Sequence, residues 1–276
     1  MGPFELTDLI GLDVGHMVME SLYNQYYQEP RFRITPLLAQ RVAAGLYGRK
    51  SKRGFYDYAS GQADAHPDLP IPNADQRTVW VSHAEPELAE KVRKALVHGG
   101  ASVGSGAAPS NDALIVVTPL GKDTTTSVVE QGLDARRTVA VDALFPLDKR
   151  RTLMCSPATA PEFRDAAHAM LAAGGVPVTV IKDGPGFIAP RVVAQIVSIA
   201  SDIAQQRIAA PRDIDLAVRL GLGYPNGPLA MGDALGPRRI LTILEGLHSF
   251  YGDPRYRPSP WLKRRALLGL SLLVGD

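Results

Sequence analysis

Apolar residues recur three or four positions apart in two distant parts of the chain, as expected for helices that bury one face. The first set is Met19, Leu22, Tyr23 and Tyr26, and the second is Ile240, Ile243, Leu244 and Leu247. Downstream of each set, Thr35-Pro36 and Ser259-Pro260 place a hydroxyl cap before a proline at a first helical position. The pattern therefore predicts a helical unit near each end of the chain, with a last helix that begins at the proline.

The two helical segments are copies of one repeat. Residues 1–45, the first copy, align with residues 226–269, the second copy, with one residue deleted. The matched pairs include Gly2 and Gly227, Pro3 and Pro228, Asp8 and Asp233, Gly11 and Gly236, Glu20 and Glu245, and Tyr26 and Tyr251. Helical patterns over 190–206 and 211–225 precede the second copy, whereas the first begins directly at Met1. We therefore expect that the first copy lacks its front end, or that a partner chain covers its apolar face.

The middle of the chain alternates between strand and helix patterns. Residues 61–76 are polar, rich in proline and without periodicity, which indicates an inter-domain linker. After it, strand-like runs occur at 77–82, 112–120, 138–144 and 176–183, and helix-like runs occur at 85–100, 124–133 and 161–175. Such alternation predicts a Rossmann-like parallel sheet with right-handed crossovers over 77–182. The expected fold class is α/β plus all-α: this sheet domain flanked by helical units over 1–60 and 183–276.

Composition narrows the classes of partner. A net charge of +2, from 30 basic and 28 acidic residues, gives no global attraction to nucleic acid or to a membrane surface. No apolar run approaches the roughly 20 residues that span a bilayer, and the N-terminal residues do not form a signal peptide. The single cysteine, Cys155, cannot form an internal disulfide and is predicted to be an ordinary small apolar residue. A soluble, cytoplasmic protein that binds neither nucleic acid nor membrane is expected.

Two motifs carry a family resemblance. GRKSKRGFYDY at 48–58 and KDGPGFIAPRVV at 182–193, with the repeated GP-x-x-x-x-D-x-x-G, resemble the helical domain of 3-hydroxyacyl-CoA dehydrogenases and the hinge that leads into it. The order helical, Rossmann, helical resembles the C-terminal portion of long-form, two-repeat bacterial enzymes such as those of phenylacetate catabolism. In those enzymes a complete Rossmann domain precedes the first helical unit.

The resemblance implies an activity for the whole enzyme. It implies NAD-dependent oxidation of a 3-hydroxyacyl-CoA to a 3-oxoacyl-CoA in fatty-acid or aromatic-acid catabolism, and a homodimer formed through the helical units. This chain would then supply helical units that mediate dimerisation and close over the substrate end of a catalytic domain outside these residues.

The nucleotide-binding positions of the family are altered in this sequence. A G-x-G-x-x-G turn after the first strand lets the backbone approach the diphosphate of NAD. Here the three glycine positions correspond to Ser82, Ala84 and Glu87, and Glu85 adds a second carboxylate where phosphate charge would lie. We expect that this chain binds no NAD.

The catalytic positions of the family are altered as well. The family's histidine and its orienting glutamate correspond to Asp142 and Met154, and the hinge asparagine corresponds to Pro190. Methionine cannot orient a base, and aspartate acts as a base near neutral pH only when burial raises its pKa. No residue of this chain is therefore predicted to be catalytic.

The remaining candidates for a site have simpler alternatives. Lys50, Lys52 and Arg53, beside Arg49, could meet the phosphates of coenzyme A, or they could form a solvated turn. Glycine, lysine and threonines at 118–126 suggest either a phosphate-binding remnant or a capped helix start, of which the second is favoured. His168 is interpreted as a packing residue, and His83 as a weak functional candidate beyond the first strand. No histidine or cysteine spacing indicates a metal site.

Two alternative functions remain at the level of sequence. The concerted loss of the glycine turn, histidine, glutamate and asparagine is compatible with a free-standing pseudoenzyme that acts as an interaction module. The degenerate Rossmann cleft is also compatible with binding of acyl-CoA without chemistry.

Overall fold

The computed structural model describes residues 2–64, 67–74 and 76–275. They form two compact units, Met1–Pro67 with Asp253–Arg255, and Asp68–Gly252 with Tyr256–Asp276. The boundary between the units falls within the predicted linker at 61–76. The second unit contains both the α/β block and the helices that follow it, with no boundary between them. The predicted domain boundary at residue 182 therefore stays a prediction.

Short helices build the first unit. They are α1 (Pro3–Ile10), α2 (Leu12–Gln25), α3 (Pro36–Ala43) and the 3-10 turns η1 (Pro30–Phe32) and η2 (Arg49–Ser51). Gly11 separates α1 from α2 with a φ of 102°, a conformation that side chains with a Cβ rarely adopt. The last helix starts at Pro36 as predicted, and the Thr35 hydroxyl accepts a hydrogen bond from the Leu37 amide at 3.4 Å.

A buried carboxylate holds the end of the first unit in place. Asp8 on α1 is 1% exposed and accepts hydrogen bonds from the amides of Phe55 and Tyr56, at 2.9 and 3.0 Å, and from the Tyr58 hydroxyl at 3.0 Å. Burial and the Asp8 carboxylate raise the pKa of Tyr58. The motif at 48–58 is thus bound to the last turn of α1 through two main-chain amides and the Tyr58 hydroxyl.

A five-stranded sheet forms the centre of the second unit, and the predicted all-parallel arrangement is wrong. The strands are β1 (Val79–Val81), β2 (Leu114–Val117), β3 (Thr138–Val141), β4 (Arg151–Cys155) and β5 (Val178–Lys182), in that spatial order. The first three are mutually parallel, whereas β4 runs antiparallel to β3 and β5 runs parallel to β4. The sequence pattern predicts no strand between the run at 138–144 and the helix at 161–175, whereas the structure has β4 there.

Helices cover both faces of the sheet. Along each strand, alternate side chains point to opposite faces. One face packs against α4 (Pro86–His98) and α6 (Pro161–Leu171), and the other packs near α5 (Thr124–Gln131) and Phe187. This α/β arrangement confirms the Rossmann-like class.

The strand order has a switch point at β1. The chain leaves β1 through α4 and returns at Val103, which forms a parallel bridge with Val79 on the edge of β1 opposite β2. The next strand, β2, lies on the other side of β1. In sheets of this kind, ligands bind outside the carboxyl ends of the strands at the switch point. The carboxyl end of β1 is therefore the place to look for a site.

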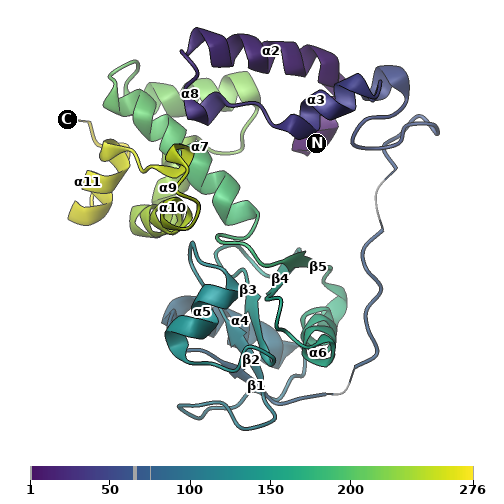
Figure 1. Ribbon diagram of the computed structural model, residues 1–276. Helices are drawn as coiled ribbons and strands as arrows, with labels where there is room; N and C mark the ends of the chain where they lie inside the picture. The colour runs from purple at the N-terminus through teal and green to yellow at the C-terminus, as the bar shows by residue number, and fades with distance from the viewer. Residues whose placement is uncertain (1, 65–66, 75, 276) are drawn as a thin grey trace. The chain divides into compact units, whose positions relative to one another are not determined.

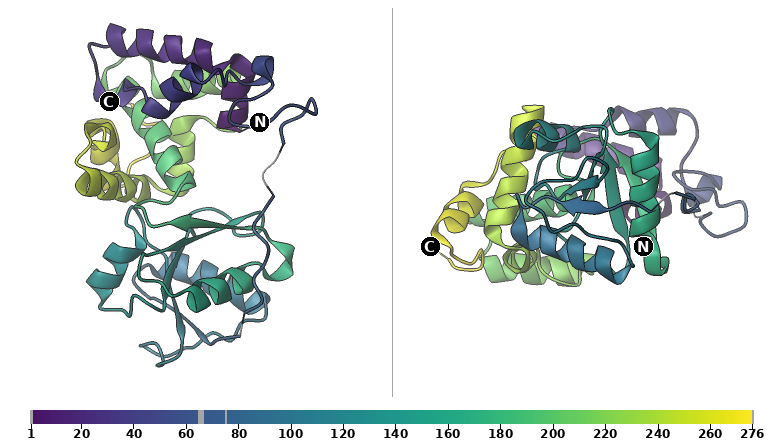
Figure 2. Two further views of the ribbon diagram at one scale, coloured as in Figure 1. Left: turned by 45° about the vertical axis from the view of Figure 1, so that its right-hand side comes forward. Right: turned by 90° about the horizontal axis from the view of Figure 1, so that it is seen from below.

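Long helices complete the second unit. They are α7 (Ala189–Gln205), α8 (Pro211–Leu222), α9 (Pro228–Leu235), α10 (Pro237–Tyr251) and α11 (Pro260–Leu268). The short 3-10 turn η3 (Ala173–Gly175) follows α6, and η4 (Pro254–Tyr256) begins in the segment that belongs to the first unit. In Figure 1 and the left view of Figure 2, α7 and α10 stand beyond one end of the sheet. Their shared core includes Ile243 and Leu244, which are fully buried.

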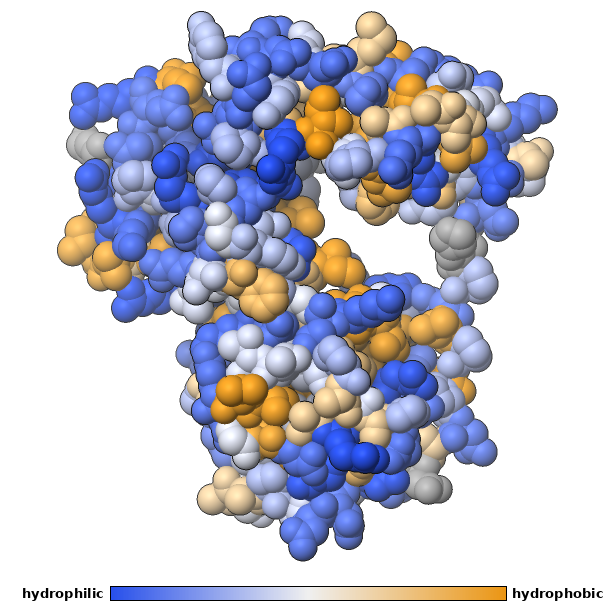
Figure 3. Space-filling model, in the orientation of Figure 1, coloured by the Kyte–Doolittle hydropathy of each residue, from blue (hydrophilic) through white to orange (hydrophobic). Residues whose placement is uncertain are grey.

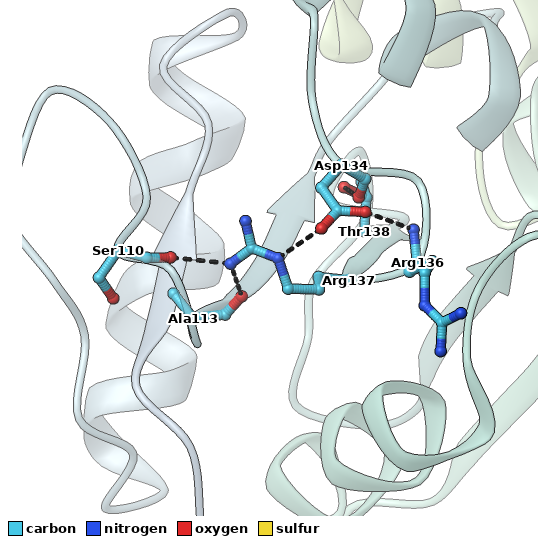
Figure 4. Close-up of polar contacts among 6 residues, drawn as sticks. All are labelled: Ser110, Ala113, Asp134, Arg136, Arg137 and Thr138. Carbon is cyan, nitrogen blue, oxygen red and sulfur yellow. Dashed lines mark hydrogen bonds and ion pairs between the residues drawn. The ribbon is translucent and has the colours of Figure 1, made fainter.

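A guanidinium group joins two loops at the start of β2 and β3. Arg137 donates to the carbonyls of Ser110 and Ala113, at 2.7 and 3.0 Å, and to the Asp134 carboxylate at 2.8 Å (Figure 4). The same carboxylate accepts the Arg136 amide at 2.9 Å. Arg137 and Asp134 thus link the loop before β2 to the turn before β3, and these hydrogen bonds stabilise that turn.

Candidate functional site

The turn after β1 uses its own side chains where a nucleotide-binding turn has bare backbone. The Ser82 hydroxyl donates to the Gln131 side chain at 2.5 Å and accepts a hydrogen bond from the Ala84 amide at 3.2 Å. Ser82 is buried, so the hydroxyl lies inside the turn. One amide that a diphosphate would need is therefore already paired.

Charged side chains occupy the start of α4. Glu87 in its first turn forms an ion pair with Arg239 of α10. Partial burial raises the pKa of Glu85, and the nearby Lys122 and Arg239 oppose that shift. The positive end of a helix dipole attracts anions, and here a carboxylate of the protein lies there.

Direct backbone contact closes the loop after β2. A Cβ at Gly246 of α10 would lie 2.5 Å from the Gly121 carbonyl oxygen, and a Cβ at Gly121 would lie 2.8 Å from the Cα of Ile243. The absence of side chains at both glycines allows α10 to pack on this loop. The carboxyl end of β1 and β2 is thus covered by the second copy of the repeat.

These contacts do not fit the diphosphate of NAD. A dinucleotide needs free amides and room at the start of the helix, and the described residues offer a paired amide, two carboxylates and a packed helix. That this chain binds no NAD stays a prediction, and the geometry favours it.

The pairing of β3 with β4 brings Asp142 and Met154, the two residues that the sequence aligns with the family's catalytic positions, to one face of the sheet. Ala140 lies opposite Met154, and the Asp142 amide donates to the Thr152 carbonyl at 3.1 Å. Asp142 and Met154 are therefore diagonal neighbours. The missed strand β4 is what establishes this arrangement.

Asp142 is a buried acid that accepts from its own turn. Its Oδ1 accepts the Leu144 amide at 3.1 Å, and burial raises the pKa of Asp142 to about 6, with the Leu144 amide and Lys91 opposing the shift. The Lys91 ammonium donates to the neighbouring Ala143 carbonyl at 3.4 Å. A carboxyl group with this pKa can exchange a proton near neutral pH. A histidine base also has a second ring nitrogen, through which another residue can orient the ring, and the carboxyl group of Asp142 has no such second nitrogen.

Met154, the residue that the sequence aligns with the family's orienting glutamate, lies inside an apolar cluster. It is fully buried with Val117, Ala140 and Phe187. Its sulfur accepts the Gly184 amide at 3.3 Å. A charged carboxylate at this place would be costly to desolvate. Pro190 is buried in the first turn of α7 and has no side-chain polar group to offer.

The segment at 118–126 is a capped helix start. Asp123 accepts the Thr126 amide at 2.7 Å, and Asp183, which follows β5, accepts the amides of Thr124 and Thr125 at 2.8 and 3.1 Å. The favoured interpretation of this segment is confirmed. Sequence reasoning missed Asp183, whose partners Thr124 and Thr125 lie 59 and 58 residues earlier in the chain.

The basic residues proposed for coenzyme A are in different surroundings. Lys50 pairs with Asp13 at 2.6 Å and thereby lowers the pKa of Asp13. Lys52 has a φ of 58° after η2, and Arg53 lines a surface hollow together with Phe55. The structure does not gather the three side chains around one point, and their role in binding coenzyme A stays a prediction.

The other candidates lie as follows. His168 is buried in α6, where burial lowers its pKa, and His83 contacts the edge of Trp80 with ring centroids 5.7 Å apart. Burial raises the pKa of Cys155 to about 11, so its thiol is a poor nucleophile. Among residues 2–64, 67–74 and 76–275, no group of three or more histidine, cysteine, aspartate or glutamate residues is placed to hold a metal ion. Within the same ranges, no helix is long and apolar enough to cross a membrane.

The chain is similar to known dehydrogenases. The family model of the 3-hydroxyacyl-CoA dehydrogenase C-terminal domain matches residues 1–58 and 186–271. A 3-hydroxyadipyl-CoA dehydrogenase of Escherichia coli (strain K12) is 35% identical over 97% of this chain. The match covers 51% of that protein, so this chain spans about half the length of the relative.

Solved structures agree with the sequence match. A crystal structure of 3-hydroxybutyryl-CoA dehydrogenase from Escherichia coli K12 matches 97% of this chain and 51% of its own, with 31% identity and a TM-score of 0.76. A (S)-3-hydroxybutyryl-CoA dehydrogenase from Ralstonia eutropha shares the fold, with 19% identity and a TM-score of 0.55 over 87% of this chain and 83% of its own. The duplicated helical motif, the hinge before α7 and these matches lead to one conclusion: the chain belongs to the 3-hydroxyacyl-CoA dehydrogenase family.

Proposed function

We propose that this chain serves NAD-dependent oxidation of a 3-hydroxyacyl-CoA to a 3-oxoacyl-CoA, with the nucleotide-binding catalytic domain outside these 276 residues. The chain contributes two helical units and an α/β domain that has become structural. Its substrate class is the acyl-CoA class named for its relatives. The acyl chain, the cytoplasmic location and a homodimer through the helical units are parts of the same proposal.

The uncovered apolar face of α2 is the observation that carries this proposal. Val18, Met19 and Leu22 of the first copy are 52%, 43% and 39% exposed. The aligned residues of the second copy, Ile243, Leu244 and Leu247, are each 0% exposed. Figure 3 shows apolar atoms at the surface of the first unit. A face of this kind marks an interaction site.

The second copy indicates what such a face is built to contact. There, α7 and the loop at Gly121 of the α/β domain cover α10. The complementary surface for α2 is accordingly a nucleotide-binding domain with its own long helix.

The test is NADH oxidation with acetoacetyl-CoA. At high concentration the chain alone should show no turnover above background. When it is mixed with the half of the Escherichia coli relative that it does not match, activity should appear. Val18→Lys should abolish this gain, because a charge on the apolar face blocks docking, whereas Val129→Lys on the exposed side of α5 should preserve it. Turnover by the chain alone would refute the proposal.

An interaction module without redox activity is the second candidate. The same uncovered face favours it, because that face needs a partner whether or not the partner is catalytic. Sedimentation with and without a complete family dehydrogenase distinguishes the two: co-migration without any gain in activity supports the module.

A further inference from the structure

The turn that ends α2 holds a tyrosine in a left-handed backbone conformation. The Gln28 amide donates to the Tyr23 carbonyl at 2.9 Å. The Tyr27 amide donates to the Asn24 carbonyl at 3.1 Å, and Tyr27 itself has a φ of 54°. Glycine is the usual residue at this position of such a helix end, because a Cβ makes the left-handed conformation unfavourable. The first copy therefore keeps a side chain here at a cost in stability.

The second copy shows that the turn itself does not need this side chain. Tyr26 aligns with Tyr251, so Tyr27 and Gly252 are the residues that follow in the two copies. Gly252 has a φ of 61°, and its amide donates to the His248 carbonyl at 2.9 Å. Glycine thus forms a left-handed helix end at the same place, so the turn does not explain Tyr27.

No contact within the described residues compensates for the conformation of Tyr27. Its side chain is 91% exposed, and no hydrogen bond or ring contact within residues 2–64, 67–74 and 76–275 involves it. Arg207, which has a φ of 56° after α7, differs because its positive charge is favourable at the carbonyl end of a helix. A tyrosine has no such charge. The favourable contact of the Tyr27 ring is therefore expected on another molecule or domain.

The surroundings of Tyr27 have the composition of the centre of a protein–protein interface. Residues 21–28 carry no charge, although most of them are exposed. Interfaces are depleted in charged residues at their centre and enriched in tyrosine. This uncharged stretch directly follows Val18 and Met19, which belong to the exposed apolar face of α2. The tyrosine thus extends the surface on which the proposed function depends.

We propose that Tyr27 is an anchor of the surface through which the first unit docks on a nucleotide-binding catalytic domain, with its ring in an apolar pocket of that domain. The inference rests on the proposed function and names a residue on which its docking step depends. The 3-hydroxyadipyl-CoA dehydrogenase of Escherichia coli supplies the occupant, because this chain matches 51% of that protein and leaves the other half unmatched. A tyrosine suits such a place, because its ring buries a large apolar area and loses little conformational entropy.

The experiment is calorimetric titration of the full chain with the unmatched half of that relative, in a preparation that binds NADH. The parent chain should bind saturably. Tyr27→Gly, which introduces the residue of the second copy, should weaken binding by about tenfold or more, because buried aromatic anchors carry much of the binding free energy. The same variant should raise the melting temperature of the first unit by about 4 °C, because glycine relieves the left-handed conformation. A residue that only supports the fold would instead lower the melting temperature when it is removed.

Two further variants separate the side chain from the turn. Gln28→Gly changes an exposed residue with a φ of 60°, so it should raise the melting temperature in the same way and bind like the parent. Tyr27→Phe keeps the ring and the backbone conformation, so its affinity should stay within about threefold of the parent's and its melting temperature should not change.

The outcomes that overturn the inference differ from those that overturn the proposed function. If the parent binds and Tyr27→Gly binds equally well, Tyr27 is no anchor and the proposed function stands. A lower melting temperature in Tyr27→Gly, or an equal loss of affinity in Gln28→Gly, would assign the effect to the turn and also refute the inference. If the parent itself does not bind, both the inference and the docking step of the proposed function fail.

Discussion

The two copies of the helical repeat have matching sequences and different surroundings. In the second copy, α10 packs against α7 and against the backbone of Gly121, and its apolar residues are fully buried. In the first copy, the same positions of α2 remain apolar and exposed. The repeat therefore specifies an apolar face, and within the second unit α7 and the α/β domain cover that face.

A second feature is shared by both copies. Asp8 and Asp233 accept main-chain amides from the segment that follows the last helix, from Phe55 in the first copy and from Leu272 in the second. Arg41 and Arg265 donate to carbonyls of the same segments. In each copy of the repeat, these two contacts fix the segment after the last helix to the helices of the same copy. The polar contacts within each copy therefore stabilise its fold, whereas the apolar face of its long helix is the surface that contacts another domain.

The largest effect is expected for the closing contact. Asp8→Ala should destabilise the first unit by about 4 kcal/mol, because two partly buried amides and the buried Tyr58 hydroxyl lose their common acceptor. Urea unfolding followed by amide signals of the first unit measures this loss. Asp57→Ala, in the same segment but exposed, should cost under about 1 kcal/mol. Similar losses in the two variants would show that Asp8 does not hold the unit closed.

A smaller effect is expected for the covered face. Leu244→Ala should cost about 3 kcal/mol, because it leaves a cavity between α10 and its neighbours. The aligned Met19→Ala should cost under about 1 kcal/mol, because Met19 is exposed. Chemical denaturation of each variant tests the pair. Equal losses would mean that both faces are covered and would break the comparison.

A pH effect should report on the unit that contains the α/β domain. Burial raises the pKa of Asp142 to about 6, above the value of roughly 3.9 in an unfolded chain. The folded state then binds the proton more tightly, so stability is greatest below about pH 4 and falls as pH rises to about 6. The loss is up to about 3 kcal/mol, at 1.36 kcal/mol for each pKa unit.

Asp142→Asn should remove this dependence, because its amide oxygen still accepts the Leu144 amide. The exposed Asp148→Asn is the control and should retain it. Urea midpoints measured between pH 4 and pH 7 decide the matter. An unchanged pH slope in Asp142→Asn would assign the dependence to other groups, such as Glu85, whose pKa is also raised.

The smallest effect concerns the glycine contact between α10 and the loop after β2. Gly246→Ser, which introduces the residue of the first copy, should cost about 2 kcal/mol through overpacking against Gly121. The reverse change, Ser21→Gly, should cost only about 0.5 kcal/mol through helix propensity. Thermal melts of the two variants provide the measurement. A neutral Gly246→Ser would mean that α10 does not pack closely on the loop.

Much of the fold is readable from the sequence because it rests on local signals. The repeat, the prolines that begin the last helices and the alternation of strands and helices are all visible within short windows. The direction of β4 is not local, since the contacts of its neighbours in the sheet determine it. Residues Arg151–Cys155 directly follow a basic run, and these five residues carry too short an apolar pattern to predict a strand.

The altered site positions could be found from motif spacing, but the groups that occupy their surroundings could not. Gln131, Asp183 and Arg239 contact Ser82, Thr124 and Glu87 from distant parts of the chain. No motif marks these partners, because any long polar side chain can supply such a contact.

Titration of the isolated chain with NADH, followed by nucleotide fluorescence and by the amide signals of Ser82 and Ala84, tests the central claim most directly. The paired Ala84 amide, the Glu87–Arg239 pair and the packed α10 predict no saturable binding up to millimolar nucleotide, with both amide signals unmoved. Saturable binding that shifts those two signals would contradict the claim, because the diphosphate would then occupy the turn after β1.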